Sequence, residues 1–148
     1  MRQSPADDHF EQAKAGFVDG LACQQAGDFA QAEAHYLRSL SLLPGRASTL
    51  INLAATQLQL ARPQDALASA DGALAVDPGS TDALLHRATA LAQLGRLHDA
   101  LAALERLLTL DPAHALAWSM RGSLLREMQR FDEAAQAFRQ ALHHGADP

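Results

Sequence analysis

The sequence predicts an all-α protein of about eight helices, arranged as four tandem helical hairpins. Pro44, Pro78 and Pro112 stand 34 residues apart. Within each period, two stretches carry apolar residues at helical spacing, as Leu84 and Leu91 do in one of them. Alanine and leucine dominate the apolar residues and aromatic residues make up only 5%, which favours close helix packing over a sheet. The same 34-residue spacing separates four alanines: Ala32, Ala66, Ala100 and Ala134.

These repeated positions divide the chain into equal units, and a chain of 148 residues has room for one domain of this kind. Residues 1-12 form an N-terminal segment that includes the start of the first helix. No insertion or deletion separates the units, so we expect the array to fill the chain. The four units are 13-46, 47-80, 81-114 and 115-148.

The ends of the helices follow from breaks at equivalent positions of each unit. The turns inside the hairpins fall at Gly27, Ala61, Gly95 and Gln129; glycine readily adopts positive φ, and Pro63 suits the start of a helix. Each hairpin ends where a proline disfavours the helical conformation of the residue before it. The expected helices, in order, are 8-26, 29-42, 47-60, 63-76, 81-94, 97-110, 115-128 and 131-144.

The last unit resembles a known repeat family. Trp118, Gly122, Ala134 and Phe138 follow the order of the tetratricopeptide repeat signature, and the two middle units keep the alanines but replace the aromatic residues. The resemblance covers most of the chain and implies a right-handed α-solenoid of four hairpins. In such arrays the first helices line a concave groove and the second helices form the convex back.

Charge patterns predict contacts between successive hairpins. Two sets of equivalent positions lie 16 residues apart, and each pair is either leucine with leucine or acidic with arginine, as expected for positions that touch. We therefore predict ion pairs in which Arg87 and Arg121 have structural partners, rather than serving as anion ligands. The second helices contribute Leu37, Asp71 and Glu105, and the following first helices contribute Leu53, Arg87 and Arg121.

Composition argues against several partners and locations. The chain has 12 basic and 17 acidic residues and a formal charge of -5, so its field repels nucleic acid. No apolar run is long enough to cross a bilayer, and the polar start lacks the core of a secretion signal. We therefore expect a cytoplasmic protein with no membrane contact. Among the basic residues only Lys14 is lysine, a bias that indicates a GC-rich, bacterial genome.

No set of residues predicts catalysis, a cofactor or a metal site, so we expect no enzyme activity. Cys23 is expected in the hairpin core, with no histidine beside it to form a reactive pair. His143 and His144 should point about 100° apart on a helix, which does not favour joint metal binding. Trp118 and Phe138 fall where the family packs its two helices together.

The groove is the predicted binding site, for an extended peptide or an amphipathic helix of a partner protein. Its N-terminal half is apolar and its C-terminal half is polar. Two alternatives leave it covered, by the segment 1-12 or by the mate of a homodimer. By resemblance, the inward-facing residues are Phe17, Leu21, Ile51, Asn52, Ala55, Leu58, Leu85, His86, Thr89, Ser119, Ser123 and Arg126.

Family members that bind chaperone tails hold the terminal carboxylate with lysine, asparagine and arginine side chains. The matching positions here are Phe17, Leu21, Asn52, Asp82 and His86. Only Asn52 fits the pattern, and Asp82 would repel a carboxylate. The sequence therefore disfavours a chaperone-tail adaptor.

The last hairpin predicts an exposed end of the array. No extra polar helix follows it, so apolar atoms around Ala135 and Leu142 are expected to meet solvent unless something covers them. Either the chain is cut from a longer protein or this end self-associates. The alternative function is therefore a self-associating module, or an accessory module of a larger enzyme such as a transferase.

Overall fold

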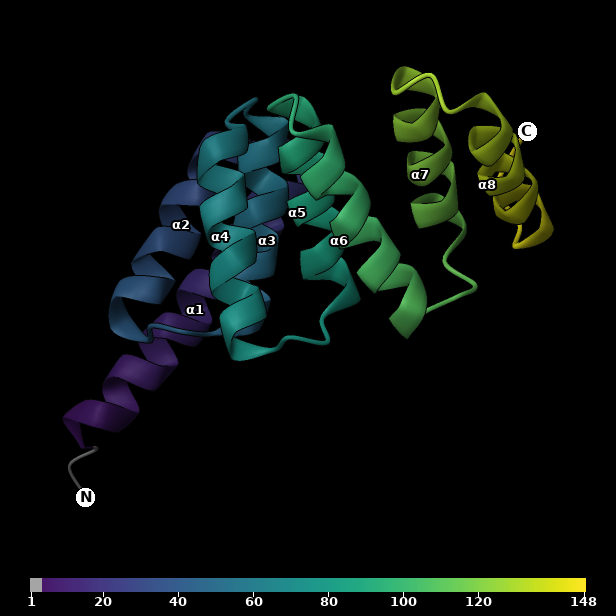
Figure 1. Ribbon diagram of the computed structural model, residues 1–148. Coiled ribbons are helices and arrows are strands. Elements are labelled where there is room, and N and C mark those ends of the chain that lie inside the picture. Colours follow the sequence, from purple (N-terminus) through teal and green to yellow (C-terminus); the bar gives the residue numbers. More distant parts are fainter. Residues whose placement is uncertain (1–3) are drawn as a thin grey trace.

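The computed structural model describes residues 4–148, and within them the chain forms eight helices and no strand (Figure 1). Residues 1–3 of the predicted segment 1-12 lie outside the described residues. The all-α fold is therefore confirmed for the described part of the chain. The helices are α1 (Pro5–Gln25), α2 (Phe29–Leu42), α3 (Ala47–Gln59), α4 (Pro63–Val76), α5 (Thr81–Gln93), α6 (Leu97–Leu110), α7 (Ala115–Glu127) and α8 (Phe131–His143).

All helix ends lie within one residue of the expected positions, except the start of the first helix. That helix begins at Pro5, three residues before the expected position 8. The Ser4 hydroxyl accepts a hydrogen bond from the Asp7 backbone N–H at 3.3 Å, and the Asp7 carboxylate accepts one from the Ser4 N–H at 3.3 Å. This reciprocal cap, followed by proline in the first turn, stabilises the extra turn.

The turns inside the hairpins share one backbone geometry. Gly27, Ala61, Gly95 and Gln129 all have positive φ, between 55° and 79°. The residue after each of them donates its N–H to a carbonyl five positions earlier, at 2.8–2.9 Å. This helix-ending hydrogen bond holds the left-handed conformation even where the residue is not glycine.

The helices pack with their neighbours in the chain. The two helices of each hairpin lie against each other, and the second helix packs on the first helix of the next hairpin. Among the first helices, α3 also touches α1 and α5, so these three line one side of the array. In Figure 1, α2, α4 and α6 form the nearer layer, with α3 and α5 behind them. This two-layered arrangement is the predicted α-solenoid.

The core consists of alanine and leucine packed between the two layers. Its largest cluster joins α5 and α6 to α7 through Leu84, Leu91, Leu104 and Leu107, all fully buried or nearly so. Such side chains fill the space between helices that are held close by alanines. The layers are therefore joined along the array by a largely aliphatic core.

Candidate partner-binding groove

The predicted groove residues lie on the four first helices. Those on α1, α3 and α5 are brought together, because these helices touch in sequence; α5 and α7 make no comparable contact. The polar C-terminal members on α7 are thus set apart from the apolar N-terminal ones. Partly buried are Phe17, Leu21, Ile51, Asn52, Ala55, Leu58, Leu85, His86, Thr89 and Ser119, whereas Ser123 and Arg126 are exposed.

Two apolar groove residues also belong to the hairpin cores. The Phe17 ring lies 6.0 Å from the Tyr36 ring, centroid to centroid, and packs beside Leu53. Leu85 packs against the central leucine cluster. These contacts hold both side chains in place, so each offers a fixed apolar edge at little further entropic cost.

Polar groove residues differ in what they can still offer a ligand. The Thr89 hydroxyl donates to the Leu85 carbonyl at 2.9 Å, which uses its only proton. The Arg126 guanidinium lies 5.9 Å from the centroid of the Phe138 ring, within cation–π range. Ser123 is exposed on the same helix. Arg126 and Ser123 are therefore the groove members that solvent reaches most readily.

His86 is the titratable residue in the middle of the groove. Burial lowers its pKa below the ordinary value, and the nearby Asp82 carboxylate only partly opposes this shift. The imidazole is therefore neutral at pH 7, with one nitrogen that donates and one that accepts. A neutral histidine suits hydrogen bonding to a peptide backbone better than binding of an anion.

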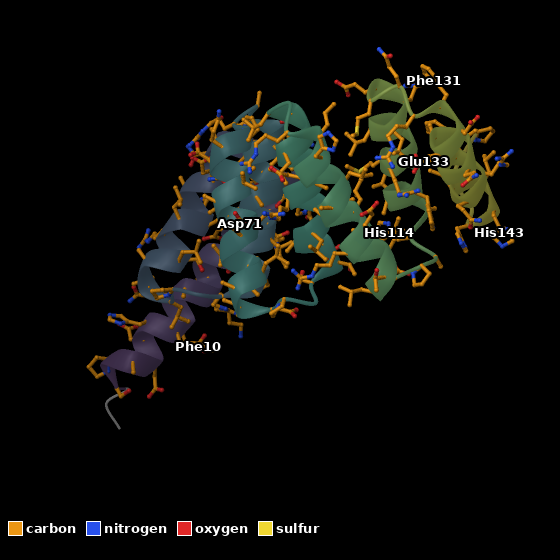
Figure 2. All side chains as sticks on the ribbon, viewed as in Figure 1. Phe10, Asp71, His114, Phe131, Glu133 and His143 are labelled. Atoms are coloured by element: carbon orange, nitrogen blue, oxygen red, sulfur yellow. The ribbon has the colours of Figure 1, made fainter. Side chains whose placement is uncertain are left out.

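The N-terminal segment does not fold back over the groove within the described residues. Residues 4–12 are exposed and continue α1 as a straight extension beyond the array (Figure 1). Phe10 lies on this extension (Figure 2), with the Arg46 guanidinium 5.9 Å from its ring centroid. Of the two alternatives for a covered groove, residues 4–12 therefore do not support the first.

Both predicted ion pairs between hairpins are confirmed. Arg87 Nε lies 2.7 Å from Asp71 Oδ1, and Arg121 Nη2 lies 3.7 Å from Glu105 Oε1. Asp71 is labelled in Figure 2. The arginines border hollows of about 500 Å³ and about 420 Å³ on the second-helix side. Since both have carboxylate partners, they serve the packing of hairpins rather than a separate anion site.

Cys23 is half-buried beside Ala32 and Tyr36, close to the expected core position. The Tyr36 hydroxyl donates to Gln24 Oε1 at 2.6 Å. Burial, with a smaller contribution from Cys23, raises the pKa of Tyr36 to about 12. Both residues therefore belong to the packing of the first hairpin.

The two histidines at the end of α8 are closer than we expected. The rings of His143 and His144 meet edge to face, with centroids 4.9 Å apart. The expected divergence was wrong because His144 is the C-cap, where the chain leaves the helix and regular helical spacing no longer applies. Within residues 4–148, no three His, Cys, Asp or Glu side chains are grouped to hold a metal ion.

Exposed apolar residues mark both ends of the array. Ala135 and Leu142 are exposed on α8, as expected. The structure adds Phe131 on α8 and Val18 on α1, which are 63% and 54% exposed. The available signal was the repeat itself, because the equivalents of Phe131 in the three earlier units are only half exposed or less. Among the described helices, none combines the length and the apolarity needed to cross a membrane.

Comparison with known proteins agrees with this architecture. The family model for the tetratricopeptide repeat matches residues 51–102 and 85–148, which together make up about two thirds of the chain. No curated protein matches it significantly.

Solved structures with the same arrangement include MamA, with 25% sequence identity, a TM-score of 0.80, and coverage of 85% of this chain and 74% of MamA. The Arabidopsis OM64 TPR domain is also 25% identical, with a TM-score of 0.78 and coverage of 80% and 98%. YrrB, described as a TPR protein with an unusual peptide-binding site, is 20% identical, with a TM-score of 0.82 and coverage of 90% and 69%. At these identities the similarity lies chiefly in the fold.

Proposed function

The chain belongs to the tetratricopeptide repeat family, and we propose that it binds an extended peptide or an amphipathic helix of a partner protein in the groove of its first helices. Proteins of this family are generally interaction scaffolds without enzyme activity, and the fold supports that broad function here. The finer proposal concerns the site and the chemistry of the ligand. YrrB illustrates that the same fold can carry a peptide-binding site.

One observation carries the proposal: a continuous row of half-exposed apolar side chains along α1, α3 and α5. Phe17, Ile51 and Leu85 occupy equivalent positions of three successive units and are all half-buried. A ligand that buries leucine-like anchors against them gains about 25 cal/mol for each Å² of apolar surface removed from water. Apolar anchors on the ligand, rather than charged ones, are therefore expected to dominate affinity.

Polar groups beside this row suit a peptide backbone. Asn52 and His86 are half-buried and adjoin Ile51 and Leu85, and side chains of this type can both donate and accept. A ligand in the groove would use them for orientation, since they sit next to the apolar anchor points. The cytoplasmic and bacterial setting inferred from composition belongs to this proposal as well.

A binding experiment tests the site directly. Peptides selected on the wild-type chain by phage display are titrated against the double variant Ile51→Asp with Leu85→Asp. We expect affinity to fall by at least about tenfold, because each ligand anchor would have to bury a carboxylate. The same pair of proteins, used for pull-downs from native lysate, then identifies the natural partner.

The matched control carries the same change on the second helices. Val76→Asp with Leu110→Asp replaces two apolar residues that are 52% and 50% exposed, and its affinity should equal that of wild type. Circular dichroism verifies that every variant is folded. Equal loss in both double variants, or no loss in either, would place binding outside the groove.

A further inference from the structure

The outer face of α8 has the character of an internal interface without a neighbour in the chain. Phe131, Ala135 and Leu142 are exposed there. One unit earlier, the equivalents of the last two are Leu101 and Leu108, which are only 5% and 8% exposed because the next hairpin covers them. Terminal faces of repeat arrays are normally polar. An apolar one is typical of an interaction surface.

The facing side of α1 has the matching character at the other end of the array. Ala15, Val18 and Ala22 are exposed, whereas Ala83 and Ala90, the equivalents of the two alanines on α5, are completely buried. The difference arises because α5 has a preceding second helix to pack against and α1 has none in the chain. The side chains on this face are the kind that a second helix covers elsewhere in the molecule.

Charge makes the two end faces complementary. At the interfaces inside the chain, a carboxylate on the second helix meets an arginine on the next first helix, as in Asp71 with Arg87. Continuing the 34-residue spacing past both ends leads from Glu105 to Arg139 on α8 and from Leu53 to Asp19 on α1. Both end residues are exposed. Their charges are opposite, with the polarity of the internal pairs reversed.

We propose that copies of this chain stack head to tail, with α8 of one copy packed on α1 of the next and Arg139 paired with Asp19 across the junction. The two faces lie at opposite ends of the array (Figure 1), and Phe131 and His143 mark the length of α8 (Figure 2). Such a junction repeats the packing of α4 on α5 or α6 on α7 between molecules. It is heterologous, so it continues the solenoid rather than closing a symmetric dimer. This assembly is independent of peptide binding in the groove.

Neighbouring charges are compatible with this junction. Asp19 borders a surface hollow together with His35 and Arg38. The repeat equivalent of Arg38, two units later, is Arg106, which borders the hollow that contains the Asp71–Arg87 pair. An arginine at this position of the second helix thus already coexists with an ion pair in the same place.

The first test exchanges the charges of the proposed pair. Sedimentation velocity over a range of concentrations should show wild type associating beyond a dimer. Asp19→Arg and Arg139→Asp should each weaken association by about tenfold or more, because like charges then face each other. The double variant carrying both changes should regain association. Wild type that stays monomeric, or a double variant no better than either single one, would overturn the proposal.

The second test separates head-to-tail stacking from a symmetric dimer. Ala22→Arg blocks the α1 face and Ala135→Arg blocks the α8 face, so each variant alone should be monomeric. An equimolar mixture should form a dimer and nothing larger, because only one intact face of each kind remains. Ala68→Arg, at an exposed alanine in the middle of the array, is the control and should associate like wild type.

Two outcomes of the second test count against the proposal. A variant with one blocked face that still dimerises alone would indicate a symmetric interface. A mixture that stays monomeric would show that the two intact faces do not bind each other. Circular dichroism identifies a variant that fails to fold, and the charge exchange at two exposed positions then decides the question by itself.

Discussion

Glycine on the first helix faces an aromatic ring on the second helix in the first and last hairpins. A Cβ added to Gly20 would lie 2.5 Å from Cε1 of Tyr36, and one added to Gly122 would lie 2.8 Å from Cδ1 of Phe138. In the two middle hairpins the same positions combine alanine with a smaller partner, Ala54 with Ala70 and Ala88 with Leu104. The size of one side chain therefore sets the space left for the other.

This close packing predicts that Gly20→Ala is destabilising, although alanine favours helices. The new methyl group would overlap the buried Tyr36 ring, which its hydrogen bond to Gln24 holds in place. Overpacking costs about 1–3 kcal/mol and the helix propensity of alanine returns about 1 kcal/mol. We expect a net loss of about 1–2 kcal/mol in the free energy of unfolding, measured by urea denaturation.

Gly72→Ala is the matched control within a helix. Its added Cβ would lie 3.5 Å from Leu50 Cδ1, an ordinary contact, so we expect a gain of about 0.5–1 kcal/mol from helix propensity. Both changes add one methyl group to a helical glycine. Stabilisation by both substitutions would show that the Tyr36 ring moves aside freely.

At the scale of the helices, successive hairpins meet through a position that accepts either leucines or an ion pair. Leu53 is buried at this position of α3, whereas Arg87 is partly exposed and paired on α5. The Asp71 side chain is 50% exposed, so water screens the pair and its contribution is small. The ion pair therefore selects the register between helices more than it stabilises the array.

A double-mutant cycle on Asp71→Leu and Arg87→Leu tests this assignment. We expect a coupling free energy of about 0.5 kcal/mol between the two sites, which decreases as salt is added. The double variant restores the leucine pair of the earlier interface and should be about as stable as wild type. Zero coupling at low salt would mean that the 2.7 Å contact contributes nothing to stability.

At the scale of the whole molecule, each hairpin is supported mainly by its neighbours in the chain. The two middle hairpins are covered on both sides, and the terminal ones on one side. Stability in such arrays is approximately a sum of hairpin and interface contributions. Local unfolding should therefore begin at the ends rather than in the middle.

Hydrogen exchange tests this order of stability. At protein concentrations low enough to keep the copies apart, the amides of α4 and α5 should exchange most slowly, and those of α1 and α8 fastest. Because stacking would cover the end faces, protection of α1 and α8 should rise with concentration while that of α4 stays constant. Uniform protection along the chain at low concentration would contradict the nearest-neighbour view.

The sequence by itself determined the number, order and ends of the helices and the ion pairs between hairpins. Turn residues, prolines and apolar periodicity act locally, and four equivalent units allow one interface to be compared with the next. The extra turn at Pro5 depends on a local cap at Ser4 and Asp7, so it too could have been predicted from the residues present.

Only the tertiary structure decided how much of each groove residue is free. Phe17 and Leu85 share their side chains between the groove and the core, and that division depends on distances between helices rather than on spacing along the chain. The same holds for the contact between His143 and His144 and for the exposure of Val18 and Phe131. Exposure is a property of what lies opposite a residue, and tertiary packing alone supplies the opposite side.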